Sequence, residues 1–159
     1  MFGASNDYYG AVNVTGEGVP MQRPNADVFT WPADDPQLLG SRCEDCGAVT
    51  FPVQPRCPRC SGRGMAELPL PRRGVLVSWT TQEFPPTVDY MGDPTGASFE
   101  PFGVGLVQLD NVVRVESRLT ESDPEKLDFG MEVELQIVPF YIDNDGNEVM
   151  TFAFAPIGA

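Results

Sequence analysis

The stretch that decides the fold is CEDCGAVTFPVQPRCPRCSG, residues 43–62, which contains two Cys-x-x-Cys pairs separated by ten residues. The sequence has four cysteines, and these pairs use all of them: Cys43, Cys46, Cys57 and Cys60. One such pair can present both sulfurs to a metal from a single tight turn, and two facing turns supply the thiolate tetrahedron that suits Zn²⁺. Small residues follow each pair, with Gly47 after the first and Ser61-Gly62 after the second. Glycine there permits positive φ, so that backbone N–H groups can point at the sulfurs. We therefore predict a structural metal site with four cysteine ligands.

Other uses of the four thiols have to be weighed. A pair of disulfides requires an oxidising compartment, and residues 1–18 lack the basic and apolar regions of a secretory signal. A redox Cys-x-x-Cys motif opens a helix after a strand, whereas both pairs here lie in sequence rich in Pro, Gly and Arg. We therefore expect a cytoplasmic protein with reduced thiols. Iron in a rubredoxin-like site uses the same ligands as zinc, so both metals stay open.

Length and charge restrict the class of protein. The 159 residues can hold one good-sized core, or a small metal module followed by a second domain. No apolar run approaches the roughly 20 residues needed to span a bilayer, so we expect no membrane association. The net charge of −13 disfavours binding to nucleic acid through the general field of the protein.

Positive charge gathers in one part of this acidic chain. Residues 41–73 contain six arginines and three acidic residues, and Arg56, Arg59 and Arg63 surround the second cysteine pair. One interpretation is that they offset the negative thiolate cluster on a small surface module. The other is an anion-binding face for the phosphates of a cofactor or for an acidic partner.

Histidine is absent from the sequence. This excludes Ser-His-Asp and Cys-His catalysis and removes the commonest general base at neutral pH. The cysteines are expected to be metal ligands, and a metal closed by four thiolates has no open coordination position. We therefore predict that the chain carries no catalytic residues of its own.

The chain divides into three predicted segments. Residues 1–26 are expected to be an extended or flexible tail. Residues 27–73 contain a short helical or turn element, the ribbon with a short strand at 49–52, and a Pro-rich linker at 68–74. Residues 74–159 show the alternating pattern of β-structure.

Five strands are predicted in the last segment, at 75–84, 104–109, 112–119, 131–138 and 148–154. Asp110-Asn111 predicts a tight hairpin, and the stretch 143–146 (DNDG) predicts another. An Asp followed by Pro and Glu within 120–127 predicts one short helical turn. The predicted fold is mainly β, with an N-terminal four-cysteine zinc ribbon followed by a five-stranded OB-fold barrel.

Several motifs together resemble a known family. They are Arg-Cys-x-x-Cys-Gly at 42–47, Cys-Pro-x-Cys at 57–60, the start of the barrel at 74–80, and Thr-Phe-x-Phe-x-Pro at 151–156. In this order the chain resembles the acyl-CoA-associated OB-fold proteins with a rubredoxin-like zinc ribbon. Members of that family accompany thiolase-fold enzymes. They include the zinc-ribbon subunit of benzoylsuccinyl-CoA thiolase, partners of aldolases that shorten steroid side chains, and archaeal bridges between a thiolase and a hydroxymethylglutaryl-CoA synthase.

The resemblance implies a non-catalytic but required subunit of a complex that makes or breaks a C–C bond in an acyl-CoA. The implied partner is a thiolase-fold large subunit in a heterotetramer, with the CoA thioester shared between subunits. Arg56, Arg59 and Arg63 then become candidates to contact the CoA phosphates, and the apolar loop 85–103, with Tyr90 and Phe99, a candidate docking segment. The alternatives are a free-standing acyl-CoA scaffold or carrier and, less favoured, a nucleic-acid-binding ribbon-OB module.

Overall fold

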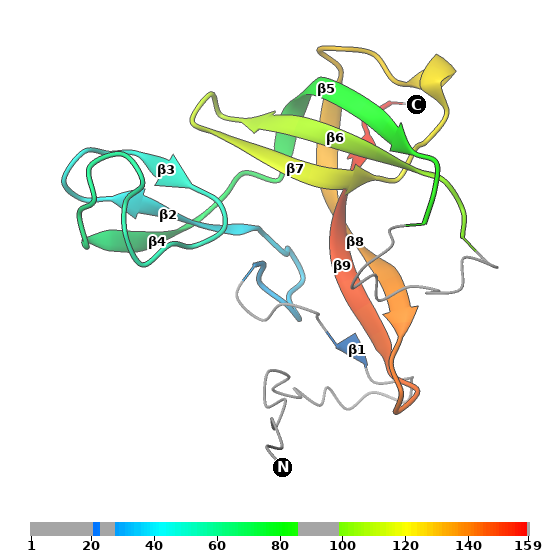
Figure 1. The fold of residues 1–159 in the computed structure, drawn as a ribbon, viewed down its shortest axis with the longest axis horizontal. Helices are drawn as coiled ribbons and strands as arrows, with labels where there is room; N and C mark the ends of the chain where they lie inside the picture. Colours follow the sequence, from blue (N-terminus) through cyan, green and yellow to red (C-terminus); the bar gives the residue numbers. More distant parts are fainter. Residues whose placement is uncertain (1–20, 23–27, 86–98, 159) are drawn as a thin grey trace.

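The chain folds into a small three-stranded sheet beside a β-barrel (Figure 1). The computed structural model describes residues 21–22, 28–85 and 99–158. The predicted tail, residues 1–26, lies outside the described residues apart from the two-residue strand β1 (Met21–Gln22), and so does 86–98 of the predicted docking loop. No helix in the described ranges is long and apolar enough to cross a membrane.

The three-stranded sheet is the predicted ribbon. Its central strand β2 (Leu39–Cys43) pairs antiparallel with β3 (Val49–Thr50) on one side and β4 (Met65–Pro69) on the other. β3 falls where the short strand at 49–52 is predicted. β4 extends into the predicted linker 68–74, so the connection to the barrel is only residues 70–72.

The segment that precedes the ribbon is a turn and contains no helix in its described part, residues 28–38. Phe29 and Leu38 form an isolated antiparallel bridge. The N–H of Thr30 donates to the carbonyl of Gln37 at 2.8 Å, and the N–H of Leu39 donates to the carbonyl of Val28 at 2.8 Å. Of the two forms predicted for this element, the turn is the one observed.

The barrel is closed and has five strands, as predicted for an OB fold. They are β5 (Arg73–Gln82), β6 (Phe102–Leu109), β7 (Val113–Leu119), β8 (Glu132–Ile142) and β9 (Glu148–Pro156). The order around the barrel is β9-β7-β6-β5-β8, and the β8–β9 pairing closes it. β7 and β9 pair parallel, through Arg118 with Ala153 and Leu119 with Phe154, while the other barrel pairings are antiparallel.

The connections follow their sequence signals. Asp110 and Asn111 have φ values of 44° and 54°, and the N–H of Val112 donates to the carbonyl of Leu109 at 3.0 Å, which closes the predicted tight turn. The helical turn η1 (Pro124–Lys126) begins where predicted, because the side chain of Asp123 accepts from the N–H of Glu125 at 3.0 Å.

β8 runs further than the prediction of 131–138. Proline lacks the N–H that a central strand needs, which is why the sequence pattern ends there. In the structure the register shifts between Pro139 and Tyr141, and pairing with β9 resumes up to Ile142 opposite Glu148. Pro139 itself pairs with Met150 and the register shift follows it, so the strand continues past the proline. The β8–β9 hairpin extends beyond the barrel as an arm (Figure 1).

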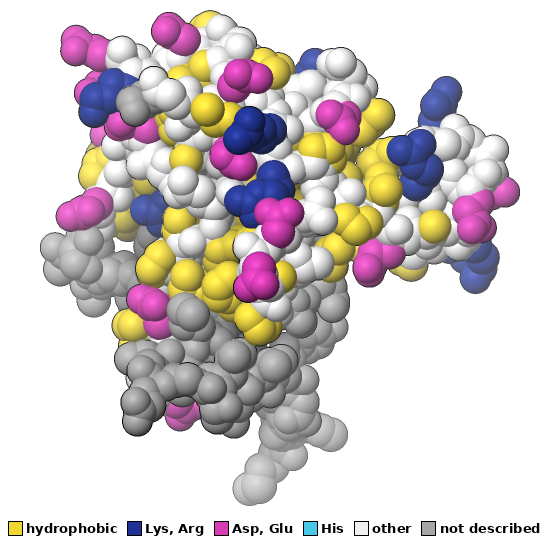
Figure 2. Space-filling view, turned by 180° about the vertical axis from the view of Figure 1, so that it is seen from behind, with side chains coloured by type: hydrophobic (Ala, Val, Ile, Leu, Met, Phe, Trp, Pro, Cys, Tyr) yellow, Lys and Arg dark blue, Asp and Glu magenta, His cyan; other side chains and the backbone are white. Residues whose placement is uncertain are grey.

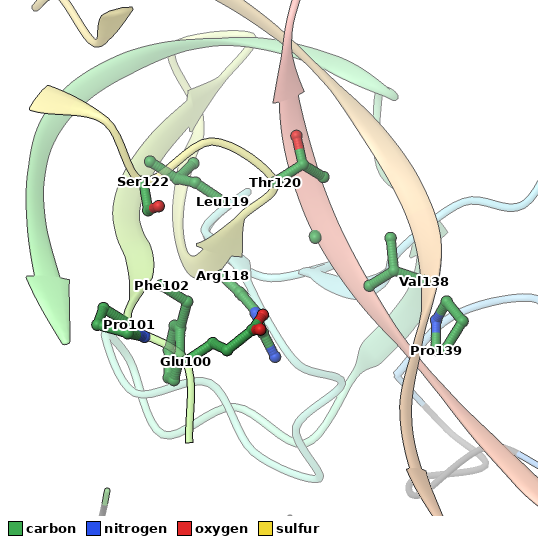
Figure 3. A pocket seen from close by; sticks show the side chains of 10 residues that line it. Glu100, Pro101, Phe102, Arg118, Leu119, Thr120, Ser122, Val138 and Pro139 are labelled. Atoms are coloured by element: carbon green, nitrogen blue, oxygen red, sulfur yellow. The ribbon is translucent and has the colours of Figure 1, made fainter. Parts of the chain in front are cut away.

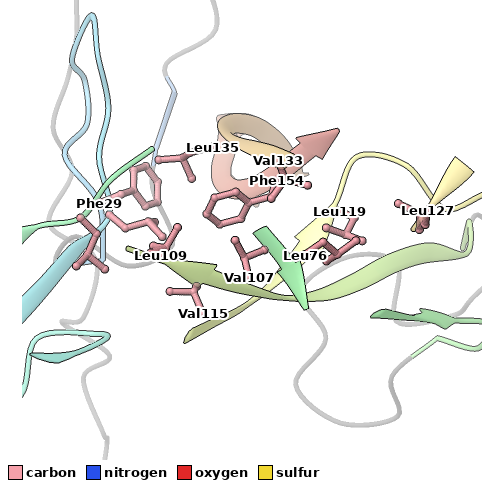
Figure 4. Packing of buried hydrophobic residues seen from close by; sticks show 12 residues of the cluster. Phe29, Leu76, Val107, Leu109, Val115, Leu119, Leu127, Val133, Leu135 and Phe154 are labelled. Carbon is pink, nitrogen blue, oxygen red and sulfur yellow. The ribbon is translucent and has the colours of Figure 1, made fainter. Parts of the chain in front are cut away.

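One hydrophobic core connects the turn segment and linker with the barrel (Figure 4). Its fully buried members are Phe29, Leu38, Leu70, Leu76, Val107, Leu109, Val115, Leu119, Leu127, Val133, Leu135 and Phe154. Alternate residues of β6 face this core, and Gly105 is one of them. A Cβ at Gly105 would lie 2.7 Å from Leu76 Cδ1 and 2.8 Å from Leu119 Cδ2, so glycine lets these two leucines cross the strand closely.

Side chains also fasten the ribbon to the barrel. The ring of Phe152 on β9 meets Phe51, after β3, edge-on with centroids 5.8 Å apart, and Phe29 at 6.3 Å. Arg72 donates to the carbonyl of Pro36 at 2.9 Å and to that of Leu135 at 3.0 Å. The guanidinium therefore joins the turn segment to β8 across the short linker.

Candidate metal centre

The two Cys-x-x-Cys turns are built on the same hydrogen-bond pattern. In the first, the N–H of Gly47 donates to the carbonyl of Cys43 at 2.9 Å, and the N–H of Cys43 donates to the carbonyl of Ala48 at 2.9 Å. In the second, the N–H of Ser61 donates to the carbonyl of Cys57 at 2.8 Å, and the N–H of Cys57 donates to the carbonyl of Gly62 at 2.9 Å. Each turn therefore folds back on its first cysteine, which brings both of its sulfurs to one side.

The small residues after the pairs have different roles in the two turns. Gly47 has the predicted positive φ, 71°. In the second turn the positive φ of 63° belongs to Ser61, so the expectation that glycine supplies it there is wrong. Gly62 is small for another reason: a Cβ there would overlap the carboxylate of Asp45 and lie 3.2 Å from Cys60 Sγ.

The four predicted ligands converge. All four sulfurs lie within 4.8 Å of one another, and no other such group of His, Cys, Asp or Glu occurs in the described ranges. Sγ of Cys43 is 3.6 Å from that of Cys60, and Sγ of Cys46 is 3.6 Å from that of Cys57, with no disulfide among them. Thiolates at about 2.3 Å from Zn²⁺ in a tetrahedron lie about 3.8 Å apart. The donor set therefore fits a tetrahedral metal.

The two cysteines of the second turn have pKa values shifted in opposite directions. The backbone N–H of Cys60 is the main group that lowers the pKa of the Cys57 thiol, to about 7, and the N–H of Arg59 contributes at 3.4 Å from the sulfur. The N–H of Gly62 pulls the pKa of Cys60 down, but the neighbouring Cys46 and Cys43 sulfurs outweigh it and raise the pKa to about 12. A bound cation would deprotonate coordinating thiols outright.

Burial indicates a structural site. Cys43 and Cys57 are 1% and 2% exposed, Cys46 is half-buried and Cys60 is exposed. Four sulfur donors complete a tetrahedral shell, so the fit is to a metal that holds the two turns together.

The ribbon arginines lie on the surface. Arg56, Arg59 and Arg63 are exposed, and none of them forms an ion pair with another residue in the described ranges. Figure 2 shows basic side chains projecting from the ribbon lobe, on the right of that view, away from the barrel. Their charge is thus available to an outside anion.

Sequence reasoning missed Arg118. Its guanidinium lies over the ring of Phe102 at 4.3 Å from the centroid, and both side chains line a cavity of about 330 Å³. The two residues are on neighbouring strands, with Val104 opposite Arg118 in the register. Phe102 falls in the predicted loop 85–103, not in the predicted strand 104–109, and in the structure it begins β6. The strand start and the pairing register that connect it with Arg118 are not visible in the sequence.

Comparison with known proteins covers both parts of the chain. The family described as "ChsH2, rubredoxin-like zinc ribbon domain" matches residues 30–66, and "ChsH2, C-terminal OB-fold domain" matches residues 67–138. A DUF35 domain-containing scaffold protein of Pyrococcus furiosus is 34% identical over 125 residues, which cover 76% of this chain and 84% of that protein. The benzoylsuccinyl-CoA thiolase subunit BbsA of Thauera aromatica is 30% identical over 133 residues, covering 82% and 85%.

A solved structure gives the same pairing of parts. The structure described as "Ltp2-ChsH2(DUF35) aldolase" matches with a TM-score of 0.56 and 26% identity. The match covers 76% of this chain and 84% of the other. It therefore extends beyond either module alone.

Proposed function

Because this chain belongs to the ChsH2 family of zinc-ribbon and OB-fold proteins, we propose that it is a non-catalytic but required accessory subunit of a thiolase-type complex. The complex makes or breaks a C–C bond in an acyl-CoA. The observation that carries this proposal is the joined ribbon and barrel, which relatives named as a thiolase subunit and as part of an aldolase share over most of their length.

The chemistry of the chain supports a division of labour. The sequence has no histidine, and its four cysteines are gathered in one cluster. Neither an imidazole base nor a spare thiol nucleophile is therefore present to attack a thioester. In this proposal the thiolase-fold large subunit performs the carbon chemistry, and the two chains form a heterotetramer.

The ribbon is proposed to serve the shared CoA thioester. Zinc or iron on the four thiolates fixes the second Cys-x-x-Cys turn, and that turn displays Arg56, Arg59 and Arg63. Exposed guanidinium groups without ion-pair partners among the described residues suit CoA phosphates or an acidic rim on the partner.

The test begins with purification of the tagged full chain from its native cells. Recovery of a thiolase-fold chain in a fixed 1:1 ratio, followed by acyl-CoA turnover that needs both purified chains, supports the proposal. Light scattering of the purified complex then measures the heterotetramer. Full turnover by the large subunit alone contradicts the accessory role.

A second candidate function is a free-standing acyl-CoA scaffold or carrier. It is favoured by the 34% identity to a protein described as a DUF35 domain-containing scaffold. A stable monomer with its own micromolar acyl-CoA affinity, measured by calorimetry, would select it. Salt-sensitive oligonucleotide binding would instead indicate a nucleic-acid module, which the net charge of −13 disfavours.

A further inference from the structure

We propose that the cavity beside Arg118 is a binding site for a small ligand that carries one carboxylate next to an apolar body. The cavity has a volume of about 330 Å³ and lies between β6–β7 and the β8–β9 hairpin, well away in the chain from the ribbon cysteines (Figure 3). Small-ligand sites commonly have volumes of ~300–1,000 Å³. This inference is independent of the accessory role, since it concerns the barrel of the chain alone.

Arg118 provides the charge for the site. Phe102 and Val104 share a face of β6, and Arg118 lies opposite Val104 on β7, so its guanidinium reaches diagonally over the Phe102 ring at 4.3 Å. Stacking on an aromatic ring occupies a flat face of the guanidinium and leaves its N–H edge free. In the described part of the chain that edge has neither a hydrogen-bond acceptor nor an ion-pair partner. A half-buried arginine with unpaired donors in a cavity is suited to a carboxylate.

The rest of the lining offers both hydroxyl groups and apolar surface. Thr120 and Ser122 carry hydroxyl groups, and Figure 3 shows them on either side of Leu119. Val138 and Pro139 of β8 line the side across from Ser122. A ligand that places its anion on Arg118 thus has an apolar wall for its body and hydroxyl groups for further oxygen contacts.

The charge of the lining selects a single carboxylate over phosphate. Glu100 lines the same cavity and forms no ion pair with Arg118 among the described contacts. Arg118 and Glu100 together give the lining no net positive charge with which to attract a dianion. The chain as a whole has a net charge of −13. A monoanion that pairs with one guanidinium edge meets less repulsion.

The test uses the full chain with 3-phenylpropionate as the probe, followed by ¹H–¹⁵N NMR at 0.15 M salt. We expect saturable shifts of the Thr120 and Ser122 amides and of the Arg118 Nε–H. The uncharged control 3-phenylpropionamide and inorganic phosphate should each shift these signals much less. Equal shifts with the amide, tighter binding of phosphate, or no shift up to the solubility limit of the acid would overturn the proposal.

Matched variants test which charged side chains contribute to binding of the probe. Arg118→Gln should weaken binding by about tenfold or more, because charge-assisted hydrogen bonds are the strong contacts. Arg114→Gln removes the same charge from the same face of β7, where the guanidinium donates to Gln108 Oε1 at 2.9 Å, and should change affinity by less than about twofold because salt screens it. Glu100→Gln should tighten binding, since it removes a like charge.

A filling variant covers the case in which Arg118→Gln disturbs the fold. Thr120 is exposed at the rim of the cavity, so Thr120→Trp should block the site while leaving the thermal melt unchanged. Full affinity in a folded Arg118→Gln variant, or in Thr120→Trp, would contradict the assignment, as would weaker binding after Glu100→Gln.

Discussion

At the residue scale, the metal centre depends on four thiolates and on the backbone that aims N–H groups at them. Cys43 and Cys57 are buried, whereas Cys60 is exposed at the end of the second turn. Ser61 adopts a φ of 63°, which is costly for a residue with a Cβ. The second turn is therefore the more strained of the two, and a metal bound to its sulfurs would hold it.

Substitution of the ligands tests the metal centre. The purified protein should contain about one zinc or iron per chain. Cys43→Ser or Cys60→Ser should lose the metal and unfold the ribbon, because binding and folding are coupled in such modules. Elemental analysis and thermal melts measure the two effects.

The control for this prediction is Ser61→Gly. It should keep the metal and stabilise the fold by about 0.5–1 kcal/mol, since glycine adopts positive φ without strain. Retention of metal and fold in both cysteine variants would contradict the ligand assignment.

Arg72 offers a second test at this scale, with Arg73 as its matched control. Arg72→Met leaves the carbonyls of Pro36 and Leu135 without their donor, so we expect a loss of about 1–3 kcal/mol in the free energy of unfolding. Arg73, whose side chain is 69% exposed, makes an ion pair to Glu134 at 3.4 Å and no other side-chain contact of this kind among the described residues. Arg73→Met should therefore change stability by less than about 0.5 kcal/mol. Urea denaturation measures both, and equal effects would show that Arg72 does not join the two parts.

The convergence of the four cysteines was predictable from the sequence, whereas the contacts of Arg72 and Arg118 were not. Ligand identity follows from a local spacing, because each pair of sulfurs is set by a four-residue turn. Arg72 donates hydrogen bonds to Pro36 and Leu135, which lie 36 and 63 positions away along the chain. Arg118 reaches Phe102 only because of the register in which β6 and β7 pair. Six arginines near the cysteines look alike in sequence, and only the fold separates the one that joins the ribbon to the barrel from those on the surface.

At the scale of elements, the β8–β9 hairpin is set by its turn. Asp143 Oδ1 accepts from the N–H groups of Asp145 at 2.9 Å and Asn147 at 2.8 Å, and Oδ2 accepts from Asn147 Nδ2 at 3.0 Å. The side chain of Asn147 is the main cause that lowers the pKa of Asp143 below its ordinary value of 3.8, followed by the Asn147 backbone N–H.

This turn predicts a pH dependence. A carboxyl group with a depressed pKa contributes stability that is fully present well above pH 3.8 and is lost as the pH falls through the lower folded value. Asp143→Asn should therefore lower the melting temperature near pH 7, and the difference from the wild type should shrink below pH 3.8. Asp145→Asn, whose side chain accepts no hydrogen bond in the described contacts, is the control and should have no such profile. A difference for Asp143→Asn that is constant with pH would contradict the role of its charge.

The elements were predictable to within a few residues because the strands of the barrel alternate and the turn residues punctuate them. Val133 and Leu135 are buried while Glu132 and Gln136 are exposed, as a half-buried strand requires. The strands of the ribbon were harder: Leu39–Cys43 and Met65–Pro69 were not predicted as strands. The burial of β2 depends on its pairing with β3 and β4 and on the cysteine turns, and β4 is mostly exposed. The side chains of neither strand therefore alternate clearly between buried and exposed.

At the scale of the whole molecule, exposed arginines project from the ribbon lobe of a chain whose net charge is −13 (Figure 2). Such a distribution steers association with an anionic surface or ligand, and it does so most at low salt. The isolated chain should show no thiolase, aldolase or hydrolase activity, since it has no histidine. Turnover by the chain alone would contradict the accessory role.

The ribbon charge gives a prediction for the assembled complex. Replacing Arg56, Arg59 and Arg63 by serine should slow association or acyl-CoA turnover by about tenfold at low ionic strength, with a smaller effect at high salt. A charge-matched variant on the barrel, with Arg73, Arg114 and Lys126 replaced by serine, should have much less effect. Stopped-flow association and steady-state assays measure this, and equal effects of the two variants would show that the position of the charge does not matter.

The closed barrel described above also has a consequence for the time course of folding. The thiol contacts of the ribbon join residues 11 and 17 positions apart, whereas the β5–β8 pairing of the barrel joins Arg73 with Glu134, 61 positions away. Longer loops cost more entropy to close, and distant pairings slow folding. We expect Co²⁺ uptake by the thiolates to precede barrel closure during refolding, with thiolate–cobalt absorbance rising before the fluorescence of Trp79 in a Trp31→Phe background. The metal-bound ribbon would then be folded before the barrel, and the more slowly folding barrel would pack against it.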